Sequence, residues 1–239
     1  MDALGKDVEQ LLGLSLSRAQ EEAFQVYARE MLDWNQRSNL TAIRTEEGVR
    51  VRHFLDSLSC WQAMRPGGDK VIDVGSGAGL PGLALKILHN PMQLTLLESV
   101  GKKADFLTHC VQVLGLEGVR VLKARAEGVG QQAEEREAYD WAIARAVAPL
   151  NVLAEYLLPL VRVGGRMLAQ KGRNVGEEVE RAKRAVEILG GGEIAVQEVQ
   201  VPGLDEARYL VVVEKVAETP EKYPRRVGVP GKRGIKPHP

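Results

Sequence analysis

Cysteine is scarce in this sequence of 239 residues, with only Cys60 and Cys110 present. Neither belongs to a C-x-x-C or a Cys/His spacing, so a disulfide framework and a cysteine-based zinc site are not expected. Both thiols are predicted to be buried. The histidines are likewise scattered without a metal-binding pattern, so we expect no metal site: His53, His89, His109 and His238.

Long apolar segments are also absent. No run approaches the roughly 20 residues that are needed to span a bilayer. The first ten residues, M-D-A-L-G-K-D-V-E-Q, have neither the basic start nor the apolar stretch of a signal peptide. The sequence therefore predicts a cytoplasmic protein without a membrane segment.

The chain carries no net charge, because 32 Lys and Arg residues balance 32 Asp and Glu residues. This balance by itself argues against strong affinity for nucleic acid. The distribution is uneven, however: residues 219–239 contain six basic residues and one acid, which gives this tail a charge of +5 and the remainder −5. Proline and glycine punctuate the tail, so we expect an extended segment without its own core. Charge alone leaves two interpretations open, a solvated tail and a phosphate-contacting arm.

The first 64 residues have a helical pattern. Ser17 and Gln20 form a capping-box signature ahead of periodic apolar residues, and Thr45 can cap a further helix that reaches Leu58. Hydrophobic residues make up 44% of the chain, which is long enough for one large α/β domain with additions. We expect a helical extension at residues 1–64, a core at residues 65–217 and a basic tail at residues 218–239.

In the core, apolar strands alternate with helices, which is typical of a parallel sheet. Strands are expected at residues 70–74, 93–97, 119–122, 139–144 and 166–170, with helices at 80–88, 102–114, 150–161 and 177–189. Residues 193–201 and 208–215 leave no room for a crossover helix and must form an antiparallel hairpin. A mostly parallel seven-stranded sheet with an antiparallel last strand is typical of Rossmann-like S-adenosylmethionine-dependent methyltransferases. A dehydrogenase sheet ends instead with a parallel strand.

A glycine-rich turn follows the first of these strands, in the segment V-I-D-V-G-S-G-A-G-L-P-G-L at residues 71–83. Glycines let the backbone turn sharply and let a ligand approach peptide N–H groups. Gly77, Gly79 and Gly82 match the dinucleotide pattern G-x-G-x-x-G, although Pro81 lies inside the turn. Asp73 would repel a pyrophosphate, but it suits the ammonium and sulfonium groups of S-adenosylmethionine. The alternative is a turn that only connects a strand to a helix.

Further candidates follow the other strands, because ligands bind off the carboxyl ends of a doubly wound sheet. Glu98 closes the second strand about twenty residues beyond the glycines, where a carboxylate can accept ribose hydroxyls. Glu127 follows the third strand, where methyltransferases bind adenine, although a solvated acid is an equally common interpretation. Arg145 leaves an apolar fourth strand, which indicates an anionic or other functional partner. The predicted cofactor-binding residues are Asp73, Gly75, Gly77, Gly79, Leu80, Glu98, Ser99, Val100, Ala126, Glu127 and Arg145.

Several motifs together resemble one family, over nearly the full length of the chain. They are W-N-Q-R-S-N-L-T-A-I-R at 34–44, R-H-F-L-D-S-L at 52–58, A-R-A-V-A at 144–148 and K-Y-P-R-R-V-G-V-P-G-K-R at 222–233, besides the glycine turn. This set resembles the bacterial 16S ribosomal RNA guanine-N7 methyltransferases, the glucose-inhibited division protein B family. The resemblance implies methylation of one guanine in the decoding-region loop of 16S rRNA. It also implies cofactor contacts at Gly75, Leu80, Glu98 to Val100, Ala126, Glu127 and Arg145. Leu80 stands where relatives can carry an aromatic residue.

The implied chemistry needs few catalytic groups. Guanine N7 has a lone pair at neutral pH, so positioning and electrostatics can supply the rate without a base. Arg145, Asn39 and His53 are candidates for orienting the guanine. His53 and Asp56 are three residues apart in a helix, and a strong alternative is that they pair to fix the N-terminal helices on the sheet.

An RNA target requires basic residues around the site to hold the surrounding phosphates. No RNA-recognition motif of the aromatic-stacking type is present, so we expect specificity to come from RNA shape and the ribosomal context. Lys102 and Lys103 open a helix, where cations oppose the helix dipole, and this suggests a ligand. Solvated side chains remain the default interpretation of the other cations. The candidate RNA-binding residues are Lys102, Lys103, Arg125, Lys171, Arg173, Arg225, Arg226, Lys232 and Arg233.

The sequence leaves the form of the substrate open between naked 16S rRNA, the small ribosomal subunit and an assembly intermediate, and it suggests a monomer. Two alternatives remain at this point. One is a methyltransferase acting on another RNA, a protein or a small molecule, and the other is a catalytically silent ribosome-assembly factor.

Overall fold

The computed structural model describes residues 1, 3–64 and 69–236, which form a seven-stranded sheet in the order β3-β2-β1-β4-β5-β7-β6. Strands β1 to β5 pair in parallel, and β7 runs antiparallel to both of its neighbours. The predicted mostly parallel sheet with an antiparallel last strand is therefore confirmed. The strands are β1 (Lys70–Val74), β2 (Gln93–Leu97), β3 (Val119–Leu122), β4 (Tyr139–Arg145), β5 (Val161–Lys171), β6 (Gly191–Val199) and β7 (Arg208–Lys215).

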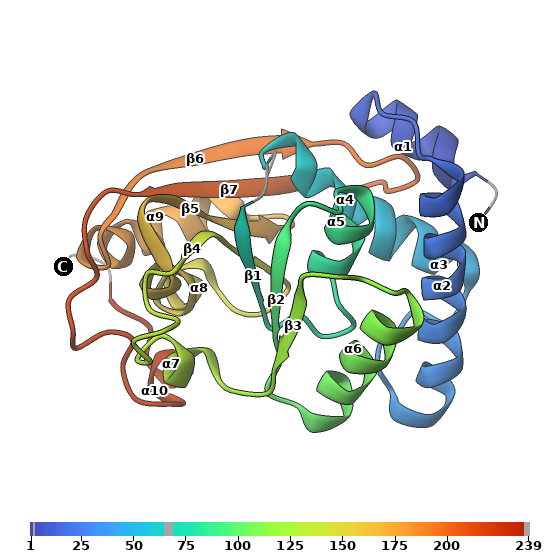
Figure 1. Ribbon diagram of the computed structural model, residues 1–239. Helices are drawn as coiled ribbons and strands as arrows, with labels where there is room; N and C mark the ends of the chain where they lie inside the picture. Colours follow the sequence, from blue (N-terminus) through green and yellow to red (C-terminus); the bar gives the residue numbers. More distant parts are fainter. Residues whose placement is uncertain (2, 65–68, 237–239) are drawn as a thin grey trace.

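Helices cover both faces of the sheet (Figure 1). Alternate residues of β1 show the two layers, since Val71 packs into one hydrophobic cluster and Ile72 into the other. The first cluster joins the sheet to α1 (Leu4–Leu12), α2 (Arg18–Ser38), α3 (Glu46–Val49), α4 (Asp56–Leu58), α5 (Gly82–Leu88) and α6 (Gly101–Val113). The second joins it to α7 (Ala126–Val129), α8 (Leu150–Leu157) and α9 (Val175–Ile188).

The N-terminal helices begin as their capping residues predict. The Ser17 hydroxyl accepts a hydrogen bond from the backbone of Gln20, whose side chain accepts one from the Ser17 backbone, and Thr45 caps α3. The single helix expected from Thr45 to Leu58 is not what forms. The chain runs through α3, a π-helix at Arg50–Leu55 and α4 into a 3₁₀ turn at Ser59–Gln62. Such a π-helical stretch often marks a functional site.

Several other boundaries differ from the expected ones, most of all around the start of β5. Strand β5 begins at Val161 rather than Arg166, and α8 ends at Leu157 because a 3₁₀ turn at Leu158–Leu160 precedes that longer strand. The predicted boundary between the helical extension and the core falls on residues 65–68, which lie outside the described residues, as do residues 237–239 of the tail.

The basic tail is packed against the core, which corrects the expectation of an extended segment. Its described part crosses α7 and α8 and contains a short helix, α10 (Val229–Lys232), beside α7 (Figure 1). Arg136 donates hydrogen bonds to the carbonyl oxygens of Thr219 and Tyr223, and Gln131 donates one to that of Pro224. Ile235 is buried in the same cluster as α8. The tail therefore uses the core of the sheet domain instead of a core of its own.

Candidate functional site

A narrow cavity of about 70 Å³ lies at the carboxyl ends of the parallel strands, next to the glycine turn. Four of the predicted cofactor-binding residues line it together, and they come from three strand-to-helix connections: Gly75, Ser99, Ala126 and Glu127. The remaining lining residues are Val74, Leu97, Ala124, Arg125, Val147 and Tyr156. Val147 and Arg125 are exposed, so they form the solvent-facing rim of the cavity.

The glycine turn needs its glycines. Gly75, Gly77 and Gly79 all have φ in the left-handed region, between 58° and 89°, where other residues are strained. A Cβ on Gly75 would lie 2.8 Å from Cγ2 of Val147, at the mouth of the cavity. A side chain at this position would therefore close the space in which a ligand could approach the turn.

Two buried carboxylates accept hydrogen bonds from the backbone of the glycine turn and of the loop after β2. Oδ2 of Asp73 accepts a hydrogen bond from the Gly82 backbone at 2.9 Å. Oε2 of Glu98 accepts one from Gly77 at 2.9 Å, and its Oε1 accepts one from Val100 at 2.7 Å. Oδ1 of Asp73 is buried and has no hydrogen-bond partner among the described residues. Burial raises the pKa of Asp73 to about 7. The hydrogen bond from Gly82 lowers this pKa, but its effect is smaller than that of burial.

The N-terminal extension also reaches the turn, through a residue that sequence reasoning did not identify. The hydroxyl of Tyr27 on α2 donates a hydrogen bond to the carbonyl oxygen of Ala78, inside the turn. Gly79 makes room for this contact, because a Cβ there would lie 2.6 Å from the Tyr27 oxygen. Tyr27 belongs to the apolar face of its helix, so no signal in the sequence distinguished it from an ordinary core residue.

Arg145, at the end of β4, is fixed by a cluster of polar side chains. Its Nη1 donates to Oδ2 of Asp56 at 2.7 Å and to the carbonyl oxygen of Arg52 at 3.1 Å. Oδ1 of Asp56 accepts hydrogen bonds from Arg208 at 2.7 Å and from Gln170 at 3.2 Å. The cluster joins the π-helix region to β4, β5 and β7. Arg208 was not identified from the sequence, although it opens a strand in the way that Arg145 closes one.

His53 lies within 3.4 Å of Arg145, so the structure brings these two predicted residues together. Its contacts fit the tautomer with the proton on Nδ1, which donates to the Arg52 carbonyl at 3.1 Å, while Nε2 accepts from the Thr41 hydroxyl at 2.8 Å. Burial, with a smaller effect of the Arg145 charge, lowers the pKa of His53 to about 4. His53 is therefore neutral at physiological pH.

Asn39 ends α2 in the left-handed conformation, with its side chain exposed. The loop that follows is held by Asn35, whose amide hydrogen-bonds to the backbone of Thr41 and Ile43. Through Thr41 this loop contacts His53. Asn39 thus lies at one end of a loop whose middle touches the Arg145 cluster.

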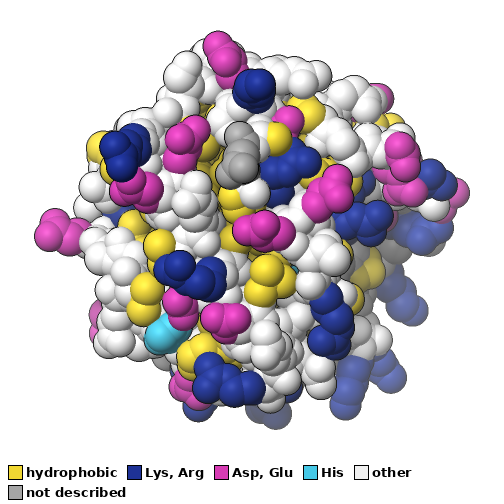
Figure 2. Space-filling model, turned by 90° about the vertical axis from the view of Figure 1, so that its right-hand side faces the viewer, with side chains coloured by type: hydrophobic (Ala, Val, Ile, Leu, Met, Phe, Trp, Pro, Cys, Tyr) yellow, Lys and Arg dark blue, Asp and Glu magenta, His cyan; other side chains and the backbone are white. Residues whose placement is uncertain are grey.

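The predicted RNA-binding residues fall into two groups. Lys171 and Arg225 pair with Glu178 and Glu155 and are only partly exposed, and Arg173 pairs with Glu206 on the surface. The others form no ion pair with a described residue and are exposed, apart from the partly buried Lys103: Lys102, Lys103, Arg125, Arg226, Lys232 and Arg233. On the side of the molecule that carries α2, cations and acids are interspersed over the centre of the view, whereas Lys and Arg side chains gather toward its lower right edge (Figure 2).

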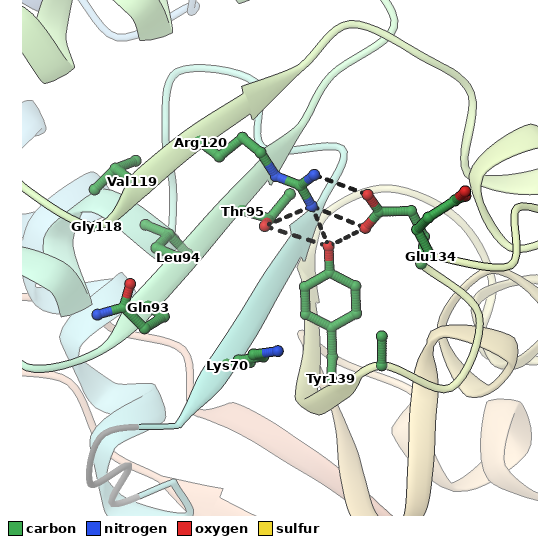
Figure 3. Close-up of a pocket in the computed structure, with 11 residues that line it drawn as sticks. Lys70, Gln93, Leu94, Thr95, Gly118, Val119, Arg120, Glu134 and Tyr139 are labelled. Atoms are coloured by element: carbon green, nitrogen blue, oxygen red, sulfur yellow. Dashed lines mark hydrogen bonds and ion pairs between the residues drawn. The ribbon is translucent and has the colours of Figure 1, made fainter.

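A larger hollow of about 520 Å³ lies at the opposite, amino-terminal ends of the strands. In it, the Arg120 guanidinium faces Glu135, Tyr139 and Thr95 and hydrogen-bonds to all three (Figure 3). None of the predicted site residues lines this hollow. Arg120, the cation of this hollow, already hydrogen-bonds to residues of the protein. The cavity at the glycine turn is therefore the better candidate site.

Within residues 1, 3–64 and 69–236, no three His, Cys, Asp or Glu side chains are grouped as a metal site would require. His238 lies outside these residues. No helix in the same part of the chain has the length and apolar character of a membrane span.

Comparison with known sequences places residues 20–208 in a family described as rRNA small subunit methyltransferase G. A protein of Roseiflexus sp. (strain RS-1), named ribosomal RNA small subunit methyltransferase G, is 54% identical over 93% of this chain and 95% of its own length. A protein of the same name from Alkaliphilus metalliredigens is 46% identical over 97% of both chains.

Solved structures are similar to the fold at much lower identity. A putative S-adenosyl-L-methionine-dependent methyltransferase from Methanococcus maripaludis aligns with a TM-score of 0.56 and 12% identity, over 80% of this chain and 93% of that one. A predicted O-methyltransferase from Agrobacterium tumefaciens aligns with a TM-score of 0.54 and 20% identity, over 70% and 81% of the two chains. At these identities the likeness concerns the fold alone.

Proposed function

Because the chain belongs to the rRNA small subunit methyltransferase G family, we propose that it methylates N7 of one guanine in the decoding-region loop of 16S rRNA, with S-adenosylmethionine as the donor. The observation that carries this proposal is the position of Arg145. It ends β4, which pairs with β1 directly before the glycine turn, and Asp56 fixes its guanidinium at 2.7 Å. A fixed cation beside a donor site is what orientation of an electron-rich base requires.

The residues around the cavity fit S-adenosylmethionine, which supplies a methyl group activated by its sulfonium charge. Asp73 carries a buried oxygen without a partner in the described chain, and its negative charge favours a cationic ligand near the end of β1. Each oxygen of Glu98 accepts one backbone hydrogen bond and retains a further lone pair for a ribose hydroxyl. Glu127 lines the cavity, and its Oε2, which no described residue hydrogen-bonds, is available to an amino group.

The remaining assigned residues define the extent of the donor site. We assign backbone and packing contacts with the cofactor to Gly75, Gly77, Gly79, Leu80, Ser99, Val100 and Ala126.

The guanine would be oriented rather than deprotonated. Its N7 has a lone pair available for attack, so His53, held neutral by burial, has no proton to remove. Nε of Arg145 makes no hydrogen bond to any residue that the structure describes, and it is available to donate to guanine O6. Asn39 is an exposed second candidate for this contact. The enzyme therefore works through placement of the base and does not need a catalytic base.

RNA phosphates would be held by the exposed cations around the cavity. Arg125 lines its rim, and Lys102 and Lys103 open α6 directly after the Glu98 loop. The tail lies against Glu127 on the same side and adds Arg226, Lys232 and Arg233. The target base must leave its stack to reach the donor, which single-stranded loops of RNA allow at small cost. Action on ribosomal RNA would place the protein in the cytoplasm, where we propose that it works as a monomer.

Transfer of radioactive methyl groups tests this function and the form of its substrate. The protein is incubated with labelled S-adenosylmethionine and with deproteinised 16S rRNA, mature small subunits or subunit precursors. We expect incorporation into at least one of these RNAs and its loss in Arg145→Ala. A catalytically silent assembly factor would bind them without incorporation, and that result would overturn the proposal.

A further inference from the structure

A buried acid anchors the basic tail. Glu155 on α8 is fully buried, and Arg225 satisfies it with three groups: its backbone N–H at 2.8 Å, Nε at 2.8 Å and Nη2 at 2.6 Å. Nη2 of Arg225 also donates to the carbonyl oxygen of Arg233 at 2.7 Å, which closes the tail on itself. The planar guanidinium of an arginine can donate from two nitrogens to the two oxygens of one carboxylate, as Arg225 does to Glu155, whereas the ammonium of a lysine cannot. Arg225 is therefore placed to hold the tail rather than an RNA phosphate.

Three residues after this anchor, the tail touches the candidate donor site. The backbone N–H of Gly228 donates to Oε1 of Glu127 at 2.8 Å. Glu127 is buried and lines the cavity, and its Oε2 makes no hydrogen bond to a residue that the structure describes. Gly228 has a φ of 79°, a left-handed conformation that glycine adopts without strain and that opens α10.

The same stretch of the tail packs against a second cavity residue. A Cβ on Gly231 would lie 3.3 Å from the hydroxyl of Tyr156, which follows Glu155 on α8 and lines the cavity. Glu155, which forms the buried ion pair, and Tyr156, which lines the cavity, are thus consecutive residues of α8. Two cations of this stretch take no part in the contact with Glu155 and are exposed to solvent, namely Arg226 and Lys232.

We propose that Arg225 and Gly228 are positioning residues for the methyl donor. The Arg225–Glu155 pair docks the tail so that Gly228 fixes one oxygen of Glu127 and leaves the other to accept the adenine amino group. This inference rests on the proposed function, because it takes an adenosine-containing donor as the ligand of the cavity. It gives the K-Y-P-R-R-V-G motif a role in donor recognition in addition to RNA binding.

Side-chain freedom supplies the physical reason. A glutamate has three rotatable side-chain bonds, and a carboxylate without the Gly228 contact samples several orientations that binding must then restrict. A docked tail removes this freedom before the ligand arrives. The benefit applies to ligands that donate a hydrogen bond to Glu127, and a ligand without that donor gains nothing from it.

The experiment compares two ligands by calorimetry, S-adenosylhomocysteine and S-inosylhomocysteine, in which a carbonyl oxygen replaces the 6-amino group. The variant is Arg225→Ala, and the matched control is Lys222→Ala, which removes one positive charge from an exposed position of the same tail. We expect Arg225→Ala to raise the Kd of S-adenosylhomocysteine about 10-fold, with little change for the inosine analogue. Lys222→Ala should leave the Kd values of both ligands unchanged. If Arg225→Ala does not fold, Arg225→Lys serves instead, with a smaller loss of preference for the amino ligand.

The outcomes separate the inference from the function on which it rests. If the wild-type protein binds neither ligand, the proposed function fails and this inference with it. If the wild-type protein binds S-adenosylhomocysteine but Arg225→Ala weakens both ligands equally, or neither, the tail has a purely structural role and the inference alone is overturned.

Discussion

Asp56 and Arg145 join the N-terminal helices to the end of β4 through a hydrogen bond of 2.7 Å between Oδ2 and Nη1. The other oxygen of Asp56 accepts from Arg208 at the start of β7, so one carboxylate balances two guanidinium groups. Both arginine side chains are largely shielded from water, which strengthens the pairs relative to surface salt bridges. The orientation of Arg145 therefore depends on a residue outside the sheet.

Replacement of Asp56 by asparagine tests this dependence. The change leaves two neighbouring arginines without their shared counter-charge, and we expect it to lower the free energy of unfolding by about 2 kcal/mol. Methyl transfer should fall further than affinity for S-adenosylhomocysteine, since Arg145 is displaced while the cavity is kept. Chemical denaturation and calorimetry measure the two effects. Asp205→Asn, at an exposed position between β6 and β7, is the control. Full activity of Asp56→Asn would show that Arg145 does not need this partner.

The buried carboxyl of Asp73 predicts an unusual dependence of stability on pH. Its pKa is about 7 in the folded chain and near 3.8 when unfolded, so the folded chain retains a proton that the unfolded chain releases. The free energy of unfolding should therefore decrease as the pH rises from about 4 to about 7. The contribution is roughly 1.4 kcal/mol per pH unit, about 4 kcal/mol in total. Urea titrations at pH 5 and pH 8 capture about 3 kcal/mol of this contribution, and Asp73→Asn should lose it. An identical pH dependence in wild-type protein, Asp73→Asn and the exposed control Asp33→Asn would contradict the argument.

His53 leads to a prediction about the reaction rate. Its pKa near 4 keeps the ring neutral above pH 5, and guanine N7 needs no base, so the rate of methyl transfer at saturating donor should be flat between pH 6 and 8. Single-turnover methyl transfer at saturating donor measures this profile. The lowered pKa of His53 also predicts that the free energy of unfolding decreases as the pH falls from about 6.5 to about 4. Over this range the unfolded chain binds a proton at His53 and the folded chain does not. A rate midpoint between pH 6 and 7 that disappears in His53→Gln would instead identify His53 as a base.

The exposed cations of the tail should bind RNA through electrostatics. A triple alanine variant at Arg226, Lys232 and Arg233 is expected to reduce the slope of log K for RNA against log salt by about 2, since each phosphate contact contributes roughly 0.7 to 0.9. The Kd for S-adenosylhomocysteine should remain unchanged, because Arg225 and Gly228 still dock the tail. Filter binding at several salt concentrations measures the slope. The control removes three exposed cations that pair with acids on their own helices: Arg18, Arg181 and Lys183. An equal change of slope in the two variants would mean that the tail has no special role.

Much of the architecture follows from local patterns in the sequence. The capping box at Ser17 and the short link before β7 were sufficient to predict α2 and the terminal hairpin, because both depend on neighbouring residues. The π-helix at Arg50–Leu55 could not be predicted in this way, since apolar side chains at helical spacing do not distinguish i→i+4 from i→i+5 hydrogen bonding.

The long-range polar contacts of the site were the least predictable part. Glu155 lies in an apolar helix, and such an acid requires a cation, but nothing in the sequence indicates that this cation is Arg225, 70 positions away. The same holds for Asp56 and Arg208. Glycine density located the turn at the end of β1, whereas the polar contacts around that turn depend on which surfaces the fold brings together.

Mass spectrometry of 16S rRNA tests the central claim most directly. RNA from cells with and without the gene, and from cells carrying Arg145→Ala, is digested and analysed for 7-methylguanosine in the decoding-region loop. We predict that one guanine of this loop is methylated at N7 only when the unaltered protein is present. The same amount of 7-methylguanosine at that position in cells without the gene would contradict the account.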